Sequence, residues 1–297
     1  MYKRQVVDEG LIESIEDPVN KYLPELNGSG YEGVKIRDVL TMSSGILFRE
    51  RYSDLTSDIN RMALTMMNGG SLDEFATTLT RQREPGTYNS YISVDTHVLG
   101  MLIKRVTGRP LTDLLREKIW HPLGMEHKSL WMIDGEGMEM AMGGLQATLR
   151  DMAHLGRLYL HEGSWNGKQI VPAQWVHDSV TPGAPHLMPG KNNPGSASSF
   201  GYGYQWWIPS KPHGDFVAVG IYDQYMYTDP TTGIIIAKTS ANKRYVDPTA
   251  VPTMDATITA MQQIAAAFGD PNWRTSTKDT AAGLQTGAQE SNGSESD

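Results

Sequence analysis

The feature that most constrains the fold of this chain is a change of pattern near residue 200. Before it, apolar residues recur at helical spacing, as at Val94, Val98 and Leu102, which share one helical face. After it come four short runs rich in aromatic and β-branched residues: YGYQWWIP, DFVAVGIYD, QYMYTDP and GIIIAKTS. Because turn residues separate them, these runs are typical of consecutive antiparallel strands.

This order predicts an α+β fold, with a helical lobe beside an antiparallel sheet flanked by helices and a cleft between the two. One folded domain is expected over residues 1–268, followed by a disordered polar tail over 269–297 that is rich in Ser, Thr, Gly, Asp and Glu. Residues 181–200, rich in Pro, Gly, Ser and Asn, are expected to form a loop. The expected helices are 35–46, a pair over 58–81 broken at Asn68-Gly69-Gly70, 94–106, 111–119, 172–180 and 253–268, the last packing across the sheet. The segment 141–160 is expected to begin with the Gly143-Gly144 pair and to continue as a helix.

Composition excludes several classes of function. The formal net charge is −8 and no dense Lys/Arg run occurs, which argues against nucleic acid or an anionic membrane as partner. The chain has no cysteine, so disulfides, thiolate zinc sites and a cysteine nucleophile are excluded. No apolar run approaches the roughly 20 residues of a membrane span. The eight histidines are scattered and no common metal or nucleotide motif is present, so neither a metal nor a cofactor is expected.

The first residues, MYKRQVVDEG, do not resemble a secretory signal, because they lack an apolar core. Val6 and Val7, followed by Gly10, look like the last turn of a buried helix and its exit. The polar residues 2–5 stand where a buried helix would be apolar. This pattern predicts that the sequence begins inside a helix and is an N-terminally truncated fragment.

An ordered set of motifs resembles the serine hydrolases related to class C β-lactamases and penicillin-binding proteins. The resemblance is nearest to their esterase and 6-aminohexanoate-dimer hydrolase branch, and it implies a β-lactamase/transpeptidase-like fold. It covers roughly residues 6–243, and the order of the motifs makes it specific although each motif alone is weak. The motifs are VVDEGLIESIEDPVNKYLPEL, IRDVLTMSSGI, EPGTYNSYISVDTHVLGMLIKRVTG, AMGGLQATLRDMAHLGRLYL, WNGKQIVPAQWV, YGYQWW and GIYDQYMYTDPTTGIIIAKTS.

The stretch Tyr91-Ile92-Ser93 resembles the family's Tyr-x-Asn/Ser motif. The resemblance implies that Tyr91 shares the acid–base work and that Ser93 completes the motif. A tyrosine of ordinary pKa near ~10 is a poor base at neutral pH unless a neighbouring cation favours the phenolate, and the lysine of the family's Ser-x-x-Lys pair would be that cation. Read alone, Tyr91 is equally a half-buried aromatic at a helix start, and Ser93 a simple N-cap.

The nucleophile itself is not found at the expected place. The resemblance implies a Ser-x-x-Lys pair on a helix before residue 6. The one literal match in the sequence, Ser240 to Lys243, follows the last predicted strand, so we interpret it as a chance match. The catalytic serine is therefore expected to lie upstream of this chain.

Residues 220–224, GIYDQ, align with the family's Gly-Ile-His-Gly-Gln version of its Lys-Thr-Gly element, expected on a strand. The resemblance implies that the N–H of Ile221 is one oxyanion donor and that Gly220 lies at the substrate site. Tyr222 replaces histidine and keeps a hydrogen-bonding hydroxyl. Asp223 replaces glycine and brings bulk and negative charge beside an oxyanion. Read alone, Ile221 is as well explained as core of a strand.

Tyr52 aligns with a tyrosine on the loop that closes over substrate in the 6-aminohexanoate-dimer hydrolases, whereas Met142 replaces an asparagine of that branch, so activity on nylon oligomers is not supported. The predicted function is a cofactor-independent serine acyl-hydrolase acting on a small-molecule ester or amide through an acyl-enzyme. The alternative is a non-catalytic homologue that binds a peptide or peptidoglycan-like ligand, which Asp223 favours.

Overall fold

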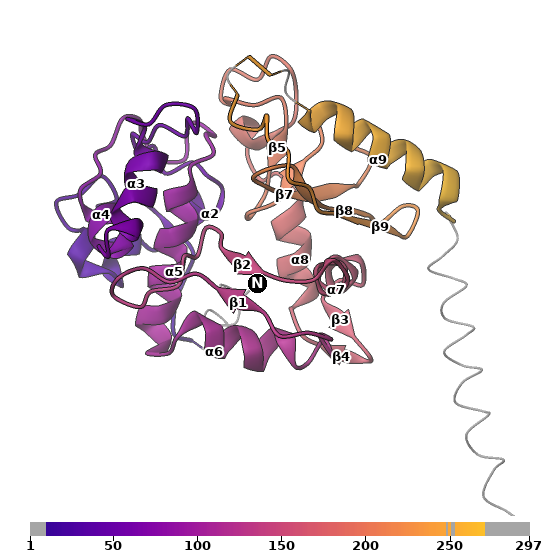
Figure 1. The fold of residues 1–297 in the computed structure, drawn as a ribbon, viewed down its shortest axis with the longest axis horizontal. Helices are drawn as coiled ribbons and strands as arrows, with labels where there is room; N and C mark the ends of the chain where they lie inside the picture. Colours follow the sequence, from indigo (N-terminus) through magenta and orange to yellow (C-terminus); the bar gives the residue numbers. More distant parts are fainter. Residues whose placement is uncertain (1–9, 248, 251–252, 271–297) are drawn as a thin grey trace, which may run out of the picture.

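The computed structural model describes residues 10–247, 249–250 and 253–270, which form two lobes (Figure 1). The helical lobe is drawn in indigo and magenta, and the sheet with its last helix in orange and yellow. The predicted helix end at Val6 and Val7 and the predicted tail from residue 271 onward lie outside the described residues. Among the residues described, no helix has both the length and the apolar content needed to cross a bilayer.

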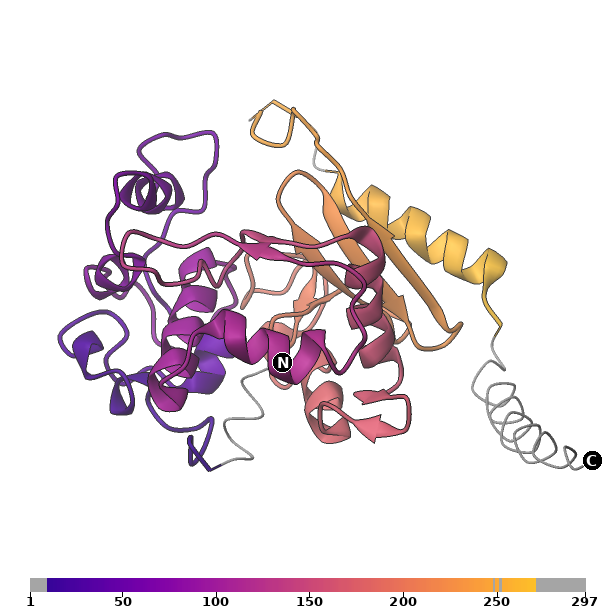
Figure 2. The same ribbon diagram turned by 60° about the horizontal axis from the view of Figure 1, so that its bottom comes forward.

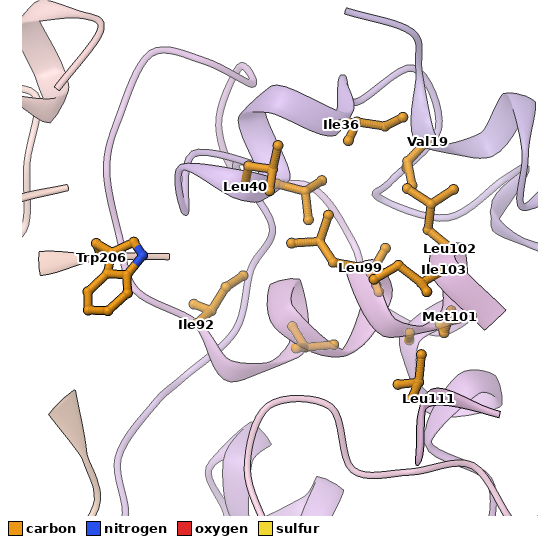
Figure 3. Packing of buried hydrophobic residues seen from close by; sticks show 14 of the residues in the cluster. Val19, Ile36, Leu40, Ile92, Leu99, Met101, Leu102, Ile103, Leu111 and Trp206 are labelled. Carbon is orange, nitrogen blue, oxygen red and sulfur yellow. The ribbon is translucent and has the colours of Figure 1, made fainter. Parts of the chain in front are cut away.

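The helical lobe is built around α5 (Ser93–Thr107), which ends at Gly108, whose φ of 64° is a left-handed C-cap that glycine adopts readily. Its apolar face packs on the preceding helices, and Figure 3 shows Leu99 beside Leu40 and Leu102 beside Val19. The other elements of this lobe are η1 (Val19–Lys21), η2 (Pro24–Leu26), α2 (Ile36–Leu40), α3 (Asp58–Met67), α4 (Leu72–Thr77), α6 (Leu111–Leu115) and the π-helical turn η3 (Arg116–Trp120).

The sheet is an antiparallel meander in which each strand pairs with the next in sequence. The predicted run YGYQWWIP forms two short strands rather than one, because Gln205, with φ of 67°, turns the chain within it. The strands are β5 (Gly201–Tyr202), β6 (Trp207–Ile208), β7 (Phe216–Gly220), β8 (Gln224–Asp229) and β9 (Ile234–Lys238).

Helices cover both faces of this sheet, α7 (Leu149–Leu160) on one and α9 (Met254–Phe268) on the other (Figure 2). Alternation along β8 explains this arrangement, since Tyr225 and Tyr227 pack with α9 whereas Met226 faces the main core. Gly156 allows α7 to approach closely, because a Cβ there would lie 2.9 Å from Cγ2 of Ile235. The predicted packing of the last helix across the sheet is confirmed.

The segment 141–160 begins with the Gly143-Gly144 pair and continues as a helix, as predicted. The chain turns at Gly143-Gly144, and α7 begins only after Thr148, whose side chain accepts a hydrogen bond from the N–H of Asp151 (3.2 Å). Between them the chain forms a strand too short to show a pattern. The short strands and the remaining helix are β1 (Leu130–Trp131), β2 (Leu145–Gln146), β3 (Ser164–Trp165), β4 (Lys168–Gln169) and α8 (Ala173–Val180).

Candidate active site

The Tyr91-Ile92-Ser93 stretch lies where the chain enters α5. Ile92 is the N-cap and Ser93 is the first helical residue, so the interpretation of Ser93 as a simple N-cap is wrong. Its Oγ donates to Oε1 of Glu50 (2.6 Å) and its N–H donates to Oε2 of the same carboxylate (2.9 Å). The start of α5 is therefore capped by a carboxylate from 43 residues away.

Glu50 also holds the predicted substrate-loop residue. Tyr52 Oη donates to Glu50 Oε1 (2.8 Å), so one carboxylate joins Tyr52 to Ser93. Burial raises the pKa of Glu50, and the hydrogen bonds from Ser93 and Tyr52 oppose this rise without cancelling it. No motif in the sequence points to Glu50, although Phe48, Glu50 and Tyr52 alternate with exposed arginines, a period-2 pattern that puts all three on one side.

Tyr91 lies half-buried between the lobes. Its ring stacks on Trp207 of β6, with ring centres 5.5 Å apart, and meets Tyr202 edge-on. Burial, and then the Glu50 carboxylate, raise the pKa of the Tyr91 phenol well above its usual range. Its described surroundings therefore keep Tyr91 protonated and suited to donate a proton, and a neighbouring cation is what would make it a base.

Residues 221–223 form the turn between β7 and β8, which corrects the prediction that GIYDQ lies on a strand. Of these five residues, only Gly220 and Gln224 belong to the strands, where they pair with each other across the β7–β8 ladder. Ile221 and Tyr222 are each 44% exposed, so Ile221 is not strand core. Tyr222 and Asp223 have φ of 60° and 67°, in the left-handed region that suits a tight turn.

The Asp223 side chain is directed into the segment that follows β9. Its Oδ2 accepts from Nδ2 of Asn242 (2.7 Å) and its Oδ1 accepts from Oγ1 of Thr253 (3.1 Å). Lys238 Nζ donates to its backbone carbonyl at 3.0 Å. Burial, and then this negative charge, raise the pKa of Tyr245. The carboxylate is thus fixed in place beside the turn.

Tyr245 links the turn to the α5 cluster. Its ring lies edge-on to Tyr52, with centres 5.9 Å apart, and 5.7 Å from the ring of Tyr222. The structure thus brings Tyr52, Tyr91 and Ser93 together around Glu50 and joins Tyr222 to them through Tyr245. No spacing or motif in the sequence signals Tyr245, which lies just beyond the residues 6–243 that carry the family-like motifs.

A cavity of about 290 Å³ lies between the lobes. Thr96, Gly100 and Ile103 line it from the α5 face that starts at Ser93, and Ala218 and Met226 line it from the sheet. Its walls are mostly apolar, and the volume is at the lower limit of small-molecule sites.

Ser240 and Lys243 do not have the geometry of a catalytic pair. They lie in non-helical chain after β9, where the N–H and carbonyl of Ser240 both bond to the side chain of Gln224. A Ser-x-x-Lys pair needs a helical turn to bring its two side chains together. Within the described ranges, no three His, Cys, Asp or Glu side chains are grouped as a metal site requires.

Known proteins resemble this chain in sequence and in fold. Residues 4–253 match the Beta-lactamase family. The 6-aminohexanoate-dimer hydrolase of Paenarthrobacter ureafaciens is 32% identical over 243 residues, which cover 80% of this chain and 62% of that protein. A solved Bacillus anthracis protein, provisionally named a 6-aminohexanoate-dimer hydrolase, superposes with a TM-score of 0.76 at 26% identity, over 89% of this chain and 70% of that one.

A penicillin-binding protein from Bacillus halodurans shares the fold at 19% identity, with a TM-score of 0.59 over 88% of this chain and 82% of that one. The chain spans less than two thirds of the length of the curated hydrolase that it matches. The family match nevertheless covers most of the chain and agrees with the two-lobed architecture, which confirms the predicted β-lactamase/transpeptidase-like fold. This chain belongs to the beta-lactamase family.

Proposed function

We propose that this chain is part of a serine acyl-hydrolase that cleaves ester or amide bonds of small molecules through an acyl-enzyme. The single observation that carries the proposal is the cluster at the start of α5, where Tyr91, Ser93 and Tyr52 surround the Glu50 carboxylate between the lobes. The hydrolase names of its relatives support the reaction class.

In the proposed reaction, the serine oxygen attacks the acyl carbon while its proton passes to the acid–base group, which then protonates the leaving group. Tyr91 is that group in our proposal. Because its described neighbours hold it as a neutral phenol, it accepts the serine proton only beside a cation, which the lysine of a Ser-x-x-Lys pair supplies. The N–H of Ile221 is the proposed oxyanion donor.

The nucleophile in this proposal lies on a Ser-x-x-Lys helix that the printed residues do not contain. We place that helix between the lobes, against the apolar walls of the cavity beside α5. Thr96 and Gly100 follow Ser93 on one face of α5, so a helix lying along this face would bring its serine within reach of Tyr91.

A serine-directed fluorophosphonate tests the proposal. In a protein that carries this chain together with a Ser-x-x-Lys helix, mass spectrometry should locate the label on the serine of that helix. The printed chain alone should remain unlabelled and should not hydrolyse p-nitrophenyl acetate. Labelling of Ser240, with turnover abolished by Ser240→Ala, would overturn the proposal.

A second candidate is a non-catalytic homologue that binds a peptide or peptidoglycan-like ligand in the same cleft. The observation that favours it is Asp223, whose fixed carboxylate lies beside the proposed oxyanion donor. If the Ser-x-x-Lys helix is present but its serine resists the fluorophosphonate while Asp223→Gly restores labelling, the native protein is the binder and not the enzyme.

A further inference from the structure

Among the residues that the structure describes, Glu50 is the carboxylate that contacts both Tyr52 and Ser93, and neither the motifs nor the family resemblance assigns it a role. It lies in the loop before α3, where its neighbour Arg49 forms an ion pair with Asp58 (Nε to Oδ2, 3.3 Å). The titratable groups that feel its charge are the phenols of Tyr52, Tyr91 and Tyr245. Glu50 therefore lies within the proposed site, and the adjacent Arg49 does not neutralise its charge because it pairs with Asp58.

The geometry fixes the direction of two hydroxyl hydrogens. An ionised carboxylate only accepts hydrogen bonds, and a hydroxyl has a single hydrogen to give. Ser93 Oγ and Tyr52 Oη both lie within hydrogen-bond distance of Glu50 Oε1, at 2.6 and 2.8 Å, so both donate their hydrogen to it. The lone pairs of both oxygens then face the rest of the site.

This direction matters for Tyr91. A hydrogen bond from the Ser93 hydroxyl would favour the Tyr91 phenolate, and Ser93 has that influence on the pKa of Tyr91. While Glu50 is ionised it takes the Ser93 hydrogen for itself, and its charge also opposes the phenolate. Glu50 and Tyr91 therefore compete for one hydrogen.

We propose that Glu50 is a positioning residue of this site: it turns the hydroxyls of Ser93 and Tyr52 away from the reacting groups and so holds Tyr91 in its proton-donating state. This proposal rests on the proposed function for its kinetic consequence, but its geometric content stands on the Glu50 contacts alone. Glu50 acts through Ser93 and Tyr52 and does not itself touch the substrate.

Glu50→Gln reverses the hydrogen bonds while keeping the shape. The N–H of Ser93 faces Oε2 and cannot turn around, so the carbonyl oxygen of the new amide must take that position. Its NH₂ group then faces Ser93 Oγ and Tyr52 Oη as a donor. Both hydroxyl hydrogens are thereby released toward the site, and the charge is removed.

The chain offers a matched control in Glu139. Oε1 of this buried carboxylate accepts both from the N–H of Thr112 (2.8 Å) and from its Oγ1 (2.8 Å), at the start of α6. The arrangement repeats that of Glu50 on Ser93 but contains no tyrosine. Glu139→Gln therefore tests the loss of a capping charge away from the proposed site.

The first experiment follows backbone amide protons by NMR in the chain as printed. The Ser93 amide shift should change with pH at a midpoint above the ordinary glutamate value of about 4.3, and this titration should vanish in Glu50→Gln. The Thr112 amide should respond instead to Glu139→Gln. A Ser93 amide that does not titrate between pH 3 and 8, or that still titrates in Glu50→Gln, would overturn the proposal.

The second experiment measures pH–rate profiles in a protein that carries the Ser-x-x-Lys helix. Glu50→Gln should shift the alkaline limb, which reports the proton donor, to lower pH and reduce kcat about tenfold or more. Glu139→Gln should leave both unchanged. In a Ser93→Ala/Tyr52→Phe background, Glu50→Gln should move the limb less, because there it removes only the charge and has no hydroxyl to turn.

An unshifted limb in Glu50→Gln, or a shift of equal size in Glu139→Gln, would refute the positioning role. If the unmutated protein with the Ser-x-x-Lys helix is not labelled by the fluorophosphonate and hydrolyses no ester, the proposed function fails. The amide titration then still decides whether Glu50 holds Ser93, so the two failures are distinct.

Discussion

Two helices of the same lobe begin at a carboxylate from elsewhere in the chain, and the two carboxylates behave in opposite ways. Glu139 caps α6 through Thr112, and Glu50 caps α5 through Ser93. Burial raises the pKa of both groups, but at Glu139 the hydrogen bonds from backbone N–H groups and Thr112 outweigh it and lower the pKa, whereas at Glu50 burial prevails.

The difference lies in the donors. Backbone N–H groups are fixed and keep a carboxylate ionised, while two of the three donors to Glu50 are hydroxyls that are able to rotate. A carboxylate held by rigid donors is a structural cap. A carboxylate held by rotatable donors beside a further phenol, Tyr91, has a protonation state that neighbouring groups are able to change.

The largest difference between the two caps is expected when the phenol of Tyr91, which only the α5 site contains, is removed. Tyr91→Phe keeps the ring and its stack on Trp207 and deletes only the hydroxyl. In a protein with the Ser-x-x-Lys helix, kcat should fall by about 10²- to 10⁴-fold with little change in KM, because a general acid–base group acts in the transition state. Steady-state kinetics should show no such loss in Tyr88→Phe, a nearby tyrosine outside the cluster. A kcat within a few-fold of the parent would remove Tyr91 from the mechanism.

The α6 side is tested by deleting its cap. Glu139→Ala leaves the N–H and hydroxyl of Thr112 without their acceptor, which should cost about 1–3 kcal/mol of unfolding free energy. Urea denaturation measures this cost, and kcat should be unchanged. A kinetic loss comparable to that of Glu50→Gln would show that the two caps do not differ in role.

The two caps should respond to pH in opposite senses. A raised pKa in the folded state means that Glu50 contributes stability below the unfolded value of about 4.3 and loses it as pH rises through the folded value. A lowered pKa means that Glu139 contributes stability above about 4.3 and loses it as pH falls through the folded value. Between pH 3 and 8, the melting temperature of the parent should therefore exceed that of Glu50→Gln by the largest amount at acidic pH. It should exceed that of Glu139→Gln by the largest amount at neutral pH. If the melting temperatures of the two variants changed with pH in the same way, the two caps would not differ in protonation behaviour.

A third buried carboxylate, Asp223, extends the comparison to the β7–β8 turn. Its donors are side chains of Asn242 and Thr253, so Asp223→Asn removes the charge and keeps a side chain that tolerates positive φ. If an oxyanion forms at Ile221, acylation should accelerate by up to about tenfold, equivalent to about 1.4 kcal/mol. Burst kinetics with a p-nitrophenyl ester measures the step. A slower acylation would mean that the carboxylate assists the reaction.

Local patterns made most of the fold predictable. The strand meander and the face of α5 follow from periodicities of two and 3.6, which need no knowledge of distant residues. The helix was predicted to follow Gly143-Gly144, but the two-residue strand β2 between this pair and α7 was missed, because a segment this short shows no periodicity. The same limit applies to β1 through β4, each too short to carry a period.

At the site, the ordered motifs predicted Tyr91, Ser93 and Tyr52, and the structure brings these three together. Glu50 was missed because Arg-Glu-Arg looks like a solvated charge run, and only a contact across 43 residues gives it a partner. Tyr245 was missed for a related reason, since its neighbours Tyr52 and Tyr222 come from opposite lobes. Contacts of this kind depend on the tertiary arrangement, which no local pattern encodes.

The stack of Tyr91 on Trp207 also gives the site an optical reporter. An indole in ring contact with the proposed proton donor emits with an intensity and wavelength that depend on what occupies its surroundings. The other six tryptophans contribute a background that Trp207→Phe leaves in place, so the difference between the two spectra isolates this one fluorophore. Ligands that enter between the lobes are therefore detectable in the unlabelled protein, including those that are bound without being cleaved.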